Sequence, residues 1–384
     1  MTVQRQTPTG WQGSTAPASP TPIGWQAPVV TDDVHHVPSA APTHDVPRET
    51  PVADERASED PSESVEPTRG PLSSDDSTSA PQVPETPVTD EAADSPILAA
   101  MADQSVRRQK VLATDVPRPA STRIMTVANQ KGGVGKTTTT VNIAAGLAQK
   151  GLLVLVIDID PQGNASTALG IDHHAEVPSI YDVVVEGDDL ASVIQPCPDV
   201  ANLWCAPATI DLAGAEIELV SLVARESRLK TAIARHLESM SDEQRFDYVL
   251  IDCPPSLGLL TVNAFVAATE VFIPIQCEYY ALEGLSQLLN NIELIRKHLN
   301  PALTVSTILM TMYDARTRLS AQVAAEVREH FPEQVLKTRI PRSVRISEAP
   351  SFGQTVITYD PASTGALSYL EAATELAQAG VAPA

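Results

Sequence analysis

The chain has 384 residues, with 26 Lys/Arg against 48 Asp/Glu, a net charge of −22 and four cysteines. The acidity argues against binding nucleic acid through the average charge of the chain, and without a CxxC pair both a disulfide framework and a cysteine metal site are weakly supported. No export signal is visible and no apolar run reaches the roughly 18 residues that a membrane helix needs, so we expect a cytoplasmic protein with no membrane partner.

Residues 1–120 differ in composition from the rest of the chain. They hold 18 of the 32 prolines, and residues 1–100 contain 4 Lys/Arg against 16 Asp/Glu. Few large apolar residues are available there to offset the entropy lost when a chain becomes ordered. We therefore expect a disordered extension rich in Pro, Ser, Thr and acidic residues over 1–120, followed by one α/β domain over 121–384.

The extension contains a short repeat. TPTGWQ at 7–12 recurs as TPIGWQ at 21–26, and each copy carries a tryptophan, Trp11 and Trp25. The repeat is either a chance duplication in biased sequence or a docking motif for an unknown partner, because an exposed tryptophan is a good anchor in a pocket.

Beyond residue 120, apolar runs alternate with helical patterns. The runs typical of buried strands are 123–128, 152–160, 246–255, 270–276, 303–313 and 335–341. The stretches with helical spacing are 138–150, 257–268, 281–299, 318–330 and 365–379. This alternation predicts a three-layer α/β fold, a mostly parallel twisted sheet with helices on both faces. Right-handed crossovers then bring the loops after the strands to one edge, where ligands bind.

A glycine-rich loop, KGGVGKTT at 131–138, lies between the first strand and the first helix. Its glycines allow backbone N–H groups to converge on phosphate oxygens, and the helix N-terminus adds a positive dipole. In such a loop Lys136 neutralises phosphate charge and the Thr137 hydroxyl ligates Mg²⁺. Asp252, after the apolar run YVLI, suits the acid that holds Mg²⁺ through water. These residues predict a P-loop NTPase fold that binds ATP and Mg²⁺.

The loop has a lysine at its start as well as at its end. Where the usual pattern has glycine, this chain has Gln130, and Lys131 follows it. The motifs DIDPQGNAS at 158–166 and DCPPS at 252–256 come after two further strands that end in an acid. Together with KGGVGKTT they resemble the deviant Walker A ATPases, in particular the ParA/Soj partitioning ATPases. The resemblance covers about 123–376.

This resemblance implies an ATP-dependent homodimer. Two copies would enclose two ATP molecules face to face, and Lys131 of each copy would reach the nucleotide of the other. Asp160 would orient the water that attacks ATP, with Lys131 and Lys136 as the other catalytic residues. Asp158 would support the Mg²⁺ shell, although a simple strand-end acid is the alternative. The residues expected at the nucleotide are Lys131, Gly132, Gly133, Val134, Gly135, Lys136, Thr137 and Thr138, with Met312, Pro341 and Phe352 as candidates for holding adenine or, equally, for core packing.

The stretch between residues 314 and 346 is a locally basic zone, because it contains seven basic residues and four acids. By resemblance, Arg316 and Arg345 occupy positions linked to non-specific DNA binding, and Arg342 and Lys337 lie in the same zone. Ordinary surface charge is the alternative for each. The resemblance further implies a ParB-type centromere-binding partner that stimulates hydrolysis of ATP to ADP and phosphate, a nucleoid location, and a chromosome or plasmid as cargo.

Three related classes are less well matched. A membrane-cycling ATPase of the MinD type ends in a basic amphipathic helix, whereas this chain ends in SYLEAATELAQAGVAPA. An iron–sulfur carrier needs paired cysteines, and Cys253 alone is better explained as a small buried residue. A tyrosine-kinase relative needs a tyrosine cluster near its end, which Tyr359 and Tyr369 do not make.

Overall fold

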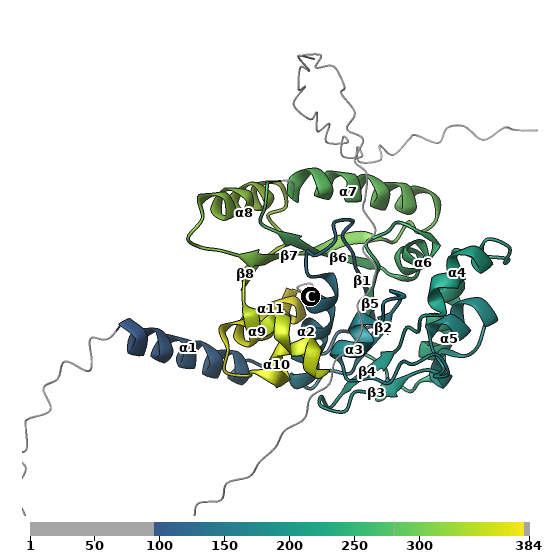
Figure 1. Ribbon diagram of the computed structural model, residues 1–384, viewed down its shortest axis with the longest axis horizontal. Coiled ribbons are helices and arrows are strands. Elements are labelled where there is room, and N and C mark those ends of the chain that lie inside the picture. The colour runs from purple at the N-terminus through teal and green to yellow at the C-terminus, as the bar shows by residue number, and fades with distance from the viewer. Residues whose placement is uncertain (1–95, 280, 380–384) are drawn as a thin grey trace, which may run out of the picture. The chain divides into compact units, whose positions relative to one another are not determined.

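The computed structural model describes residues 96–279 and 281–379 (Figure 1). The stretch 1–95, with the repeat around Trp11 and Trp25, lies outside these residues. Within the described ranges, none of the helices has the length and apolar character needed to cross a bilayer.

One eight-stranded sheet forms the centre of the fold. Its strands run in the order β3-β4-β2-β5-β1-β6-β7-β8, and every neighbouring pair is parallel except the edge pair β3–β4. The strands are β1 (Arg123–Val127), β2 (Val154–Asp158), β3 (Gln195–Pro196), β4 (Leu203–Ala206), β5 (Tyr248–Asp252), β6 (Glu270–Gln276), β7 (Thr304–Tyr313) and β8 (Val335–Pro341). The predicted parallel α/β sheet is therefore confirmed.

The central strands are apolar throughout because both of their faces are buried. In β2, Val154 and Val156 join the core on one face, while Leu155 and Ile157 join the core on the other. Side chains alternate between the two faces of a strand, so a strand covered on both sides has no position for a solvated residue.

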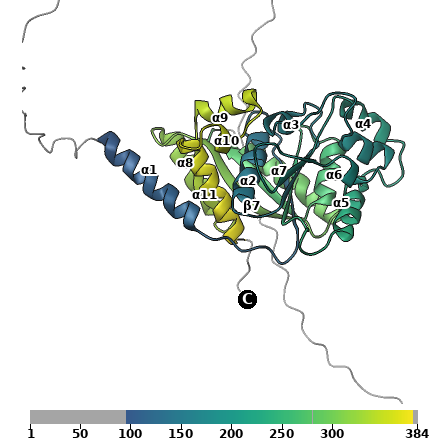
Figure 2. The same cartoon turned by 90° about the horizontal axis from the view of Figure 1, so that it is seen from below.

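Helices cover both faces of the sheet (Figures 1 and 2). The helices are α1 (Pro96–Ala113), α2 (Lys136–Gln149), α3 (Asn164–Ala168), α4 (Leu212–Leu219), α5 (Arg228–Ser239), α6 (Leu259–Ala267), α7 (Ala281–His298), α8 (Arg318–His330), α9 (Val344–Glu348), α10 (Val356–Tyr359) and α11 (Thr364–Ala379), with short irregular turns η2 (Asp182–Glu186), η3 (Leu190–Ser192) and η4 (Ala349–Phe352). Helices α2 and α11 pack on one face, and α5 to α8 pack on the other. This is the three-layer arrangement that the sequence predicts.

The folded part of the chain begins earlier than predicted. Helix α1 lies inside the stretch 1–120 and packs on α11 (Figure 2). The Arg107 guanidinium donates two hydrogen bonds to the Glu371 carboxylate, at 3.0 and 2.7 Å, and Val111 is buried. The Lys150 ammonium donates to the carbonyl oxygens of Val111 and Thr114 at the C-terminal end of α1. The prediction of disorder is therefore wrong for the segment that α1 occupies.

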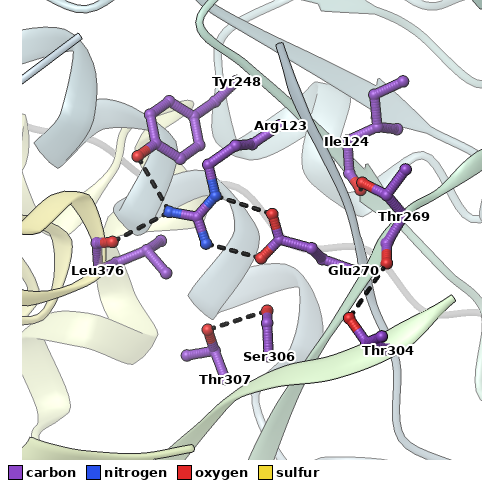
Figure 3. Close-up of polar contacts among 9 residues, drawn as sticks. All are labelled: Arg123, Ile124, Tyr248, Thr269, Glu270, Thr304, Ser306, Thr307 and Leu376. Carbon is purple, nitrogen blue, oxygen red and sulfur yellow. Dashed lines mark hydrogen bonds and ion pairs between the residues drawn. The ribbon is translucent and has the colours of Figure 1, made fainter. Parts of the chain in front are cut away.

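One arginine ties the amino-terminal ends of three strands to the last helix (Figure 3). Arg123, at the start of β1, forms a two-pronged ion pair with Glu270 of β6 at 2.8 and 2.6 Å. The same guanidinium donates to the Tyr248 hydroxyl of β5 and to the Leu376 carbonyl oxygen of α11. Burial alone would raise the pKa of Glu270, but the Arg123 cation lowers it below the usual value.

Candidate nucleotide-binding site

The three predicted site segments meet at the carboxyl-terminal edge of the sheet. Parallel pairing places Asp252 of β5 between two neighbours, with Val127 of β1 on one side and Asp158 of β2 on the other. The glycine-rich loop follows β1 directly. The prediction that these segments share one edge is confirmed.

The glycine-rich loop leads into α2 through left-handed backbone. Gly133 has φ of 74° and Gly135 has φ of 87°, a region that residues with a Cβ rarely adopt. Lys136 is the first residue of α2. The Thr311 hydroxyl of β7, two strands away from β1, donates to the Val134 carbonyl oxygen at 2.8 Å and so fixes the loop. The free N–H groups of the helix start therefore face the space beside the loop.

A cavity of about 460 Å³ lies against this loop. It is lined by Gly132, Gly133, Gly135, Lys136, Thr137, Thr138, Asp160, Gln162, Asn164, Thr167, Ala168, Pro255, Met312 and Pro350. The predicted nucleotide residues that line it together with Asp160 are Gly132, Gly133, Gly135, Lys136, Thr137, Thr138 and Met312, whereas Lys131, Val134, Pro341 and Phe352 do not line it. The lining residues Thr167 and Ala168 of α3 and Pro350 of η4 were not predicted.

Lys136 is a buried cation with little local compensation. Lys136 is 8% exposed. The one contact of its ammonium that approaches hydrogen-bond distance is with the Lys131 carbonyl oxygen, at 3.5 Å. Burial lowers the pKa of Lys136, and the nearby carboxyls of Asp252 and Asp160 oppose that effect. A phosphate in the cavity would supply the anion that this ammonium lacks.

Asp252 and Thr137 together form an oxygen-donor pair at the loop. The Asp252 carboxylate accepts hydrogen bonds from the hydroxyls of Thr137 at 2.7 Å and Thr140 at 2.8 Å. Complete burial, and then the nearby Asp158 carboxyl, raise the pKa of Asp252 to about 8. Hard oxygen donors of this kind suit Mg²⁺, which also keeps water and phosphate oxygens as ligands. No cluster of three His, Cys, Asp or Glu able to hold a metal occurs among the described residues, so phosphate and water would have to complete the shell.

Asp158 is held by hydrogen bonds to the loop that follows β2. It is fully buried, and its carboxylate accepts from the Asp160 N–H at 3.2 Å and from the N–H and hydroxyl of Ser166 at 2.9 and 2.8 Å. Burial raises its pKa to about 6. Both oxygens are therefore engaged in holding the loop between β2 and α3. Asp158 does not line the cavity, and its place in the Mg²⁺ shell stays a prediction.

The carboxylate of Asp160 lies at the cavity wall. It is 7% exposed, and one of its oxygens accepts from the Gln162 N–H at 3.1 Å. Because Asp158 and Ser166 hold the backbone on either side, the carboxylate is fixed relative to the phosphate loop. Such a group can orient a water molecule.

Lys131 lies at the rim and not in its own cavity. Its ammonium donates to Glu278 at 2.9 Å, and the side chain is absent from the cavity lining. Glu278 also accepts a short hydrogen bond from the Gln276 amide, and the Arg342 guanidinium lies 3.8 Å away. The sequence did not identify Glu278 as the partner of Lys131, because the two residues are 147 positions apart.

A second, smaller cavity of about 140 Å³ adjoins the first. Gly135, Thr138 and Met312 line both, and Pro341 lines the smaller one. Met312 has φ of 50°, which is unusual for a residue with a Cβ and commonly marks a functional site. Phe352 lines neither cavity. Its ring is exposed and stacks on the Tyr359 ring, with 4.9 Å between the ring centroids. The adenine role expected of Phe352 is therefore not supported.

The predicted DNA-binding cations are exposed, and three of them are paired with acids. Arg316 forms a two-pronged ion pair with Asp314 and lowers the pKa of that carboxyl to about 2. The Arg345 guanidinium lies 3.1 Å from the Glu348 carboxylate and 3.4 Å from the Asp360 carboxylate. Arg342 lies near Glu278, as described above, and Lys337 is exposed on β8.

The cysteines do not form a cluster. All four are buried as free thiols. Cys253 lies 3.0 Å from the Thr126 hydroxyl, and burial raises its pKa to about 12. The interpretation of Cys253 as a small buried residue is confirmed.

Comparisons with known proteins identify the family of the chain. Residues 122–305 match a family described as AAA domain. The sporulation initiation inhibitor protein Soj of Bacillus subtilis is 55% identical over 258 residues, which cover 67% of this chain and 99% of that protein. The chromosome partitioning protein ParA of Caulobacter vibrioides is 48% identical over 255 residues, which cover 66% of this chain and 93% of that protein.

One similar solved structure contains a bound nucleotide analogue. Cobyrinic acid a,c-diamide synthase from Mycobacterium smegmatis, with bound ATP analog and magnesium, is 38% identical with a TM-score of 0.56, covering 66% of this chain and 92% of that one. Since the chain covers nearly the whole length of Soj at 55% identity, it belongs to the ParA/Soj family of chromosome partitioning ATPases.

Proposed function

We propose that this chain closes into a dimer around ATP, binds DNA non-specifically as a dimer, and segregates a chromosome or plasmid with a ParB-type partner that stimulates hydrolysis. The observation that carries the proposal is the position of Lys131, whose ammonium lies outside the cavity of its own loop. A flexible side chain with a point charge at the rim of one site is suited to reach the site of a facing copy. Dimerisation would then respond to the terminal phosphate of ATP.

The proposed ATP site is the cavity beside the glycine-rich loop. Lys136 would compensate phosphate charge, and the loop N–H groups would hold the phosphate oxygens. Thr137 and Asp252 would hold Mg²⁺, which supplies charge neutralisation at the phosphates when bound. Met312 and Pro341 would contact adenine in the smaller cavity, with Thr138 between the two cavities.

Asp160 is the proposed hydrolytic residue. Its fixed carboxylate at the cavity wall would orient a water molecule toward the terminal phosphate, giving ADP and phosphate. The ATPase unit is assigned to 121–384, preceded by an extension over 1–120 that carries α1. Nothing in the described residues addresses a partner for the Trp11/Trp25 repeat.

DNA binding is assigned to the exposed arginines Arg316, Arg342 and Arg345, together with Lys337. Pairing two subunits doubles this set, so the number of phosphate contacts would grow on dimerisation. The proposed location is therefore the nucleoid, reached in the ATP-bound dimer and left after hydrolysis.

Two variants separate binding from turnover. Lys136→Ala removes the buried cation, so we expect loss of ATP binding and of dimerisation. Asp160→Ala leaves the loop intact, so we expect ATP-driven dimerisation to persist while hydrolysis falls by at least about 100-fold. Sedimentation with ATP and Mg²⁺, together with phosphate release, measures both. Wild-type hydrolysis by Asp160→Ala, or a wild-type protein that stays monomeric with a non-hydrolysable ATP analogue, would contradict the proposal.

A further inference from the structure

Asn129 is a buried polar residue at the point where the chain leaves β1 and enters the glycine-rich loop. It is 6% exposed. Its Nδ2 donates to the Pro274 carbonyl oxygen of β6 at 2.9 Å, and its Oδ1 accepts from the Lys131 N–H at 3.0 Å. Both polar atoms of one buried amide therefore join the backbone of Lys131 to the neighbouring strand.

The Asn129 amide takes the place of a backbone donor. The Ala128 N–H donates to the Phe272 carbonyl oxygen of β6 at 3.1 Å. If the parallel ladder continued, the next donor would be the N–H of Gln130 and its acceptor would be Pro274. The Asn129 side chain meets that acceptor instead. The backbone can therefore turn away from the sheet after Ala128 while the start of the loop stays attached to β6.

The part of the loop that faces the cavity is held by a different strand. There the Thr311 hydroxyl of β7 donates to the Val134 carbonyl oxygen at 2.8 Å. Asn129 contacts neither of these residues through its side chain, and it does not line the cavity. The loop thus has one anchor on β6, at Lys131, and another on β7, at its phosphate-binding part. A change at Asn129 should release the first anchor and leave the second in place.

We propose that Asn129 is a positioning residue, which holds the backbone of Lys131 where its ammonium can reach the nucleotide of a facing copy. The inference rests on the proposed function, which assigns that reach to Lys131. A lysine side chain has a fixed length, so the place of its Cα decides how far the ammonium extends beyond the rim. A displacement of about 1 Å in a positioned group can lower a rate by about 100-fold.

Two variants release the two anchors separately. Asn129→Ala frees the start of the loop, so we expect the dimer dissociation constant with a non-hydrolysable ATP analogue and Mg²⁺ to rise by at least about tenfold, and the affinity of the monomer for the analogue to change by less than about twofold. Thr311→Val frees the phosphate-binding part and should weaken binding of the analogue by the monomer about tenfold. Sedimentation equilibrium measures the dimer, and titration at protein concentrations below the dimer dissociation constant measures the monomer. If alanine impairs folding, Asn129→Asp takes its place, because it has the same shape and loses only the donor to Pro274.

A mixed dimer shows which copy's nucleotide depends on Asn129. Asn129→Ala protein is mixed with Asp160→Ala protein above the dimer dissociation constant, so that in the mixed dimer only the site with an intact Asp160 can hydrolyse ATP. That site belongs to the Asn129→Ala copy and receives Lys131 from the copy with normal Asn129. We expect its hydrolysis to return to within about twofold of a wild-type site. As the control, a second copy that carries Lys131→Ala together with Asp160→Ala lends no cation and should restore nothing.

The outcomes separate this inference from the proposed function. A wild-type protein that stays monomeric with the analogue would remove the proposed function itself. If the wild type dimerises, an equally tight Asn129→Ala dimer would overturn only the role of Asn129. Weakened analogue binding by the folded Asn129 variant as a monomer would overturn it too, because the amide would then serve the phosphate loop of its own copy. The same holds for a mixed dimer that is no more active than the Asn129→Ala protein alone.

Discussion

At the scale of single residues, Glu278 connects two parts of the site. It accepts from the Lys131 ammonium at 2.9 Å and lies 3.8 Å from the Arg342 guanidinium. In the proposed dimer Lys131 must leave this partner to reach the other subunit's nucleotide. The pair is partly exposed, so its contribution is small, about 0 to 1 kcal/mol. Breaking the contact between Lys131 and Glu278 would therefore add a small free-energy cost to closing the dimer.

We expect Glu278→Gln to tighten the ATP-dependent dimer. Each subunit would lose the contact with Glu278 that competes for Lys131. Because a dimer contains two such contacts, the effect of one is squared, and the dissociation constant should fall by at most about 25-fold. Sedimentation with the non-hydrolysable analogue measures the change. Asp189→Asn, which breaks the exposed ion pair with Arg235, is the control and should have no effect. A weaker dimer in Glu278→Gln would show that Glu278 acts in the closed state instead.

At the scale of secondary-structure elements, Arg123 joins three strands and α11 through one guanidinium (Figure 3). Arg123 and Glu270 have side chains 13% and 16% exposed, so each depends on the other for compensation. Glu270→Gln leaves the cation without its anion, and we expect a loss of about 2 to 4 kcal/mol in the free energy of unfolding. Replacing both residues by methionine should cost less than either single change, because no buried charge is left unpaired.

The same pair predicts a pH dependence. The pKa of Glu270 is lower in the folded than in the unfolded chain, so its stabilising effect is present above the ordinary carboxyl range. The effect is lost as pH falls through the lowered pKa. Urea unfolding should therefore show a stability difference between wild type and Glu270→Gln at pH 7, and the difference should shrink as pH falls through the lowered pKa of Glu270. The exposed pair Arg296–Glu293 supplies the control, since Glu293→Gln should change stability by less than about 0.5 kcal/mol.

Local patterns explain which elements the sequence could predict. The strands β6 and β8 have their predicted bounds, β6 because its five inner residues are all apolar. The four-residue strand β4 and the eight-residue helix α4 are too short for periodicity to be recognised. Helix α1 depends on contacts with α11 far away in the sequence, which no local pattern records.

The candidate site divides in the same way. The spacing of the glycine-rich loop and the acids that end β2 and β5 are local signals, so the sequence could identify them. The contact between Lys131 and Glu278 and the use of Asp158 to hold Ser166 depend on how separate segments pack. The sequence motifs therefore identified the chemical groups of the site, whereas the separate contacts of its acids could be seen only in the structure.

At the scale of the whole molecule, DNA binding has to overcome the overall charge. The chain carries −22, so a single copy offers DNA a small basic area on an acidic protein. In the proposed dimer that area is presented twice. Two subunits bound side by side share one DNA molecule, which raises affinity beyond that of either subunit alone.

We therefore expect DNA binding with ATP and Mg²⁺, and little with ADP or without nucleotide. In the ATP state, the affinity should fall linearly with salt on a double-logarithmic plot, with a slope of about −0.9 for each phosphate contacted. Arg316→Ala with Arg345→Ala removes two cations from each subunit, so the slope should become shallower by up to about 4. Arg296→Ala on α7 is the matched control, since that exposed arginine lies outside the basic zone and should leave the slope unchanged. Because the measurement compares slopes, it separates phosphate contacts from a general loss of affinity. An unchanged slope in the double variant, with dimerisation intact, would place the DNA surface elsewhere on the molecule.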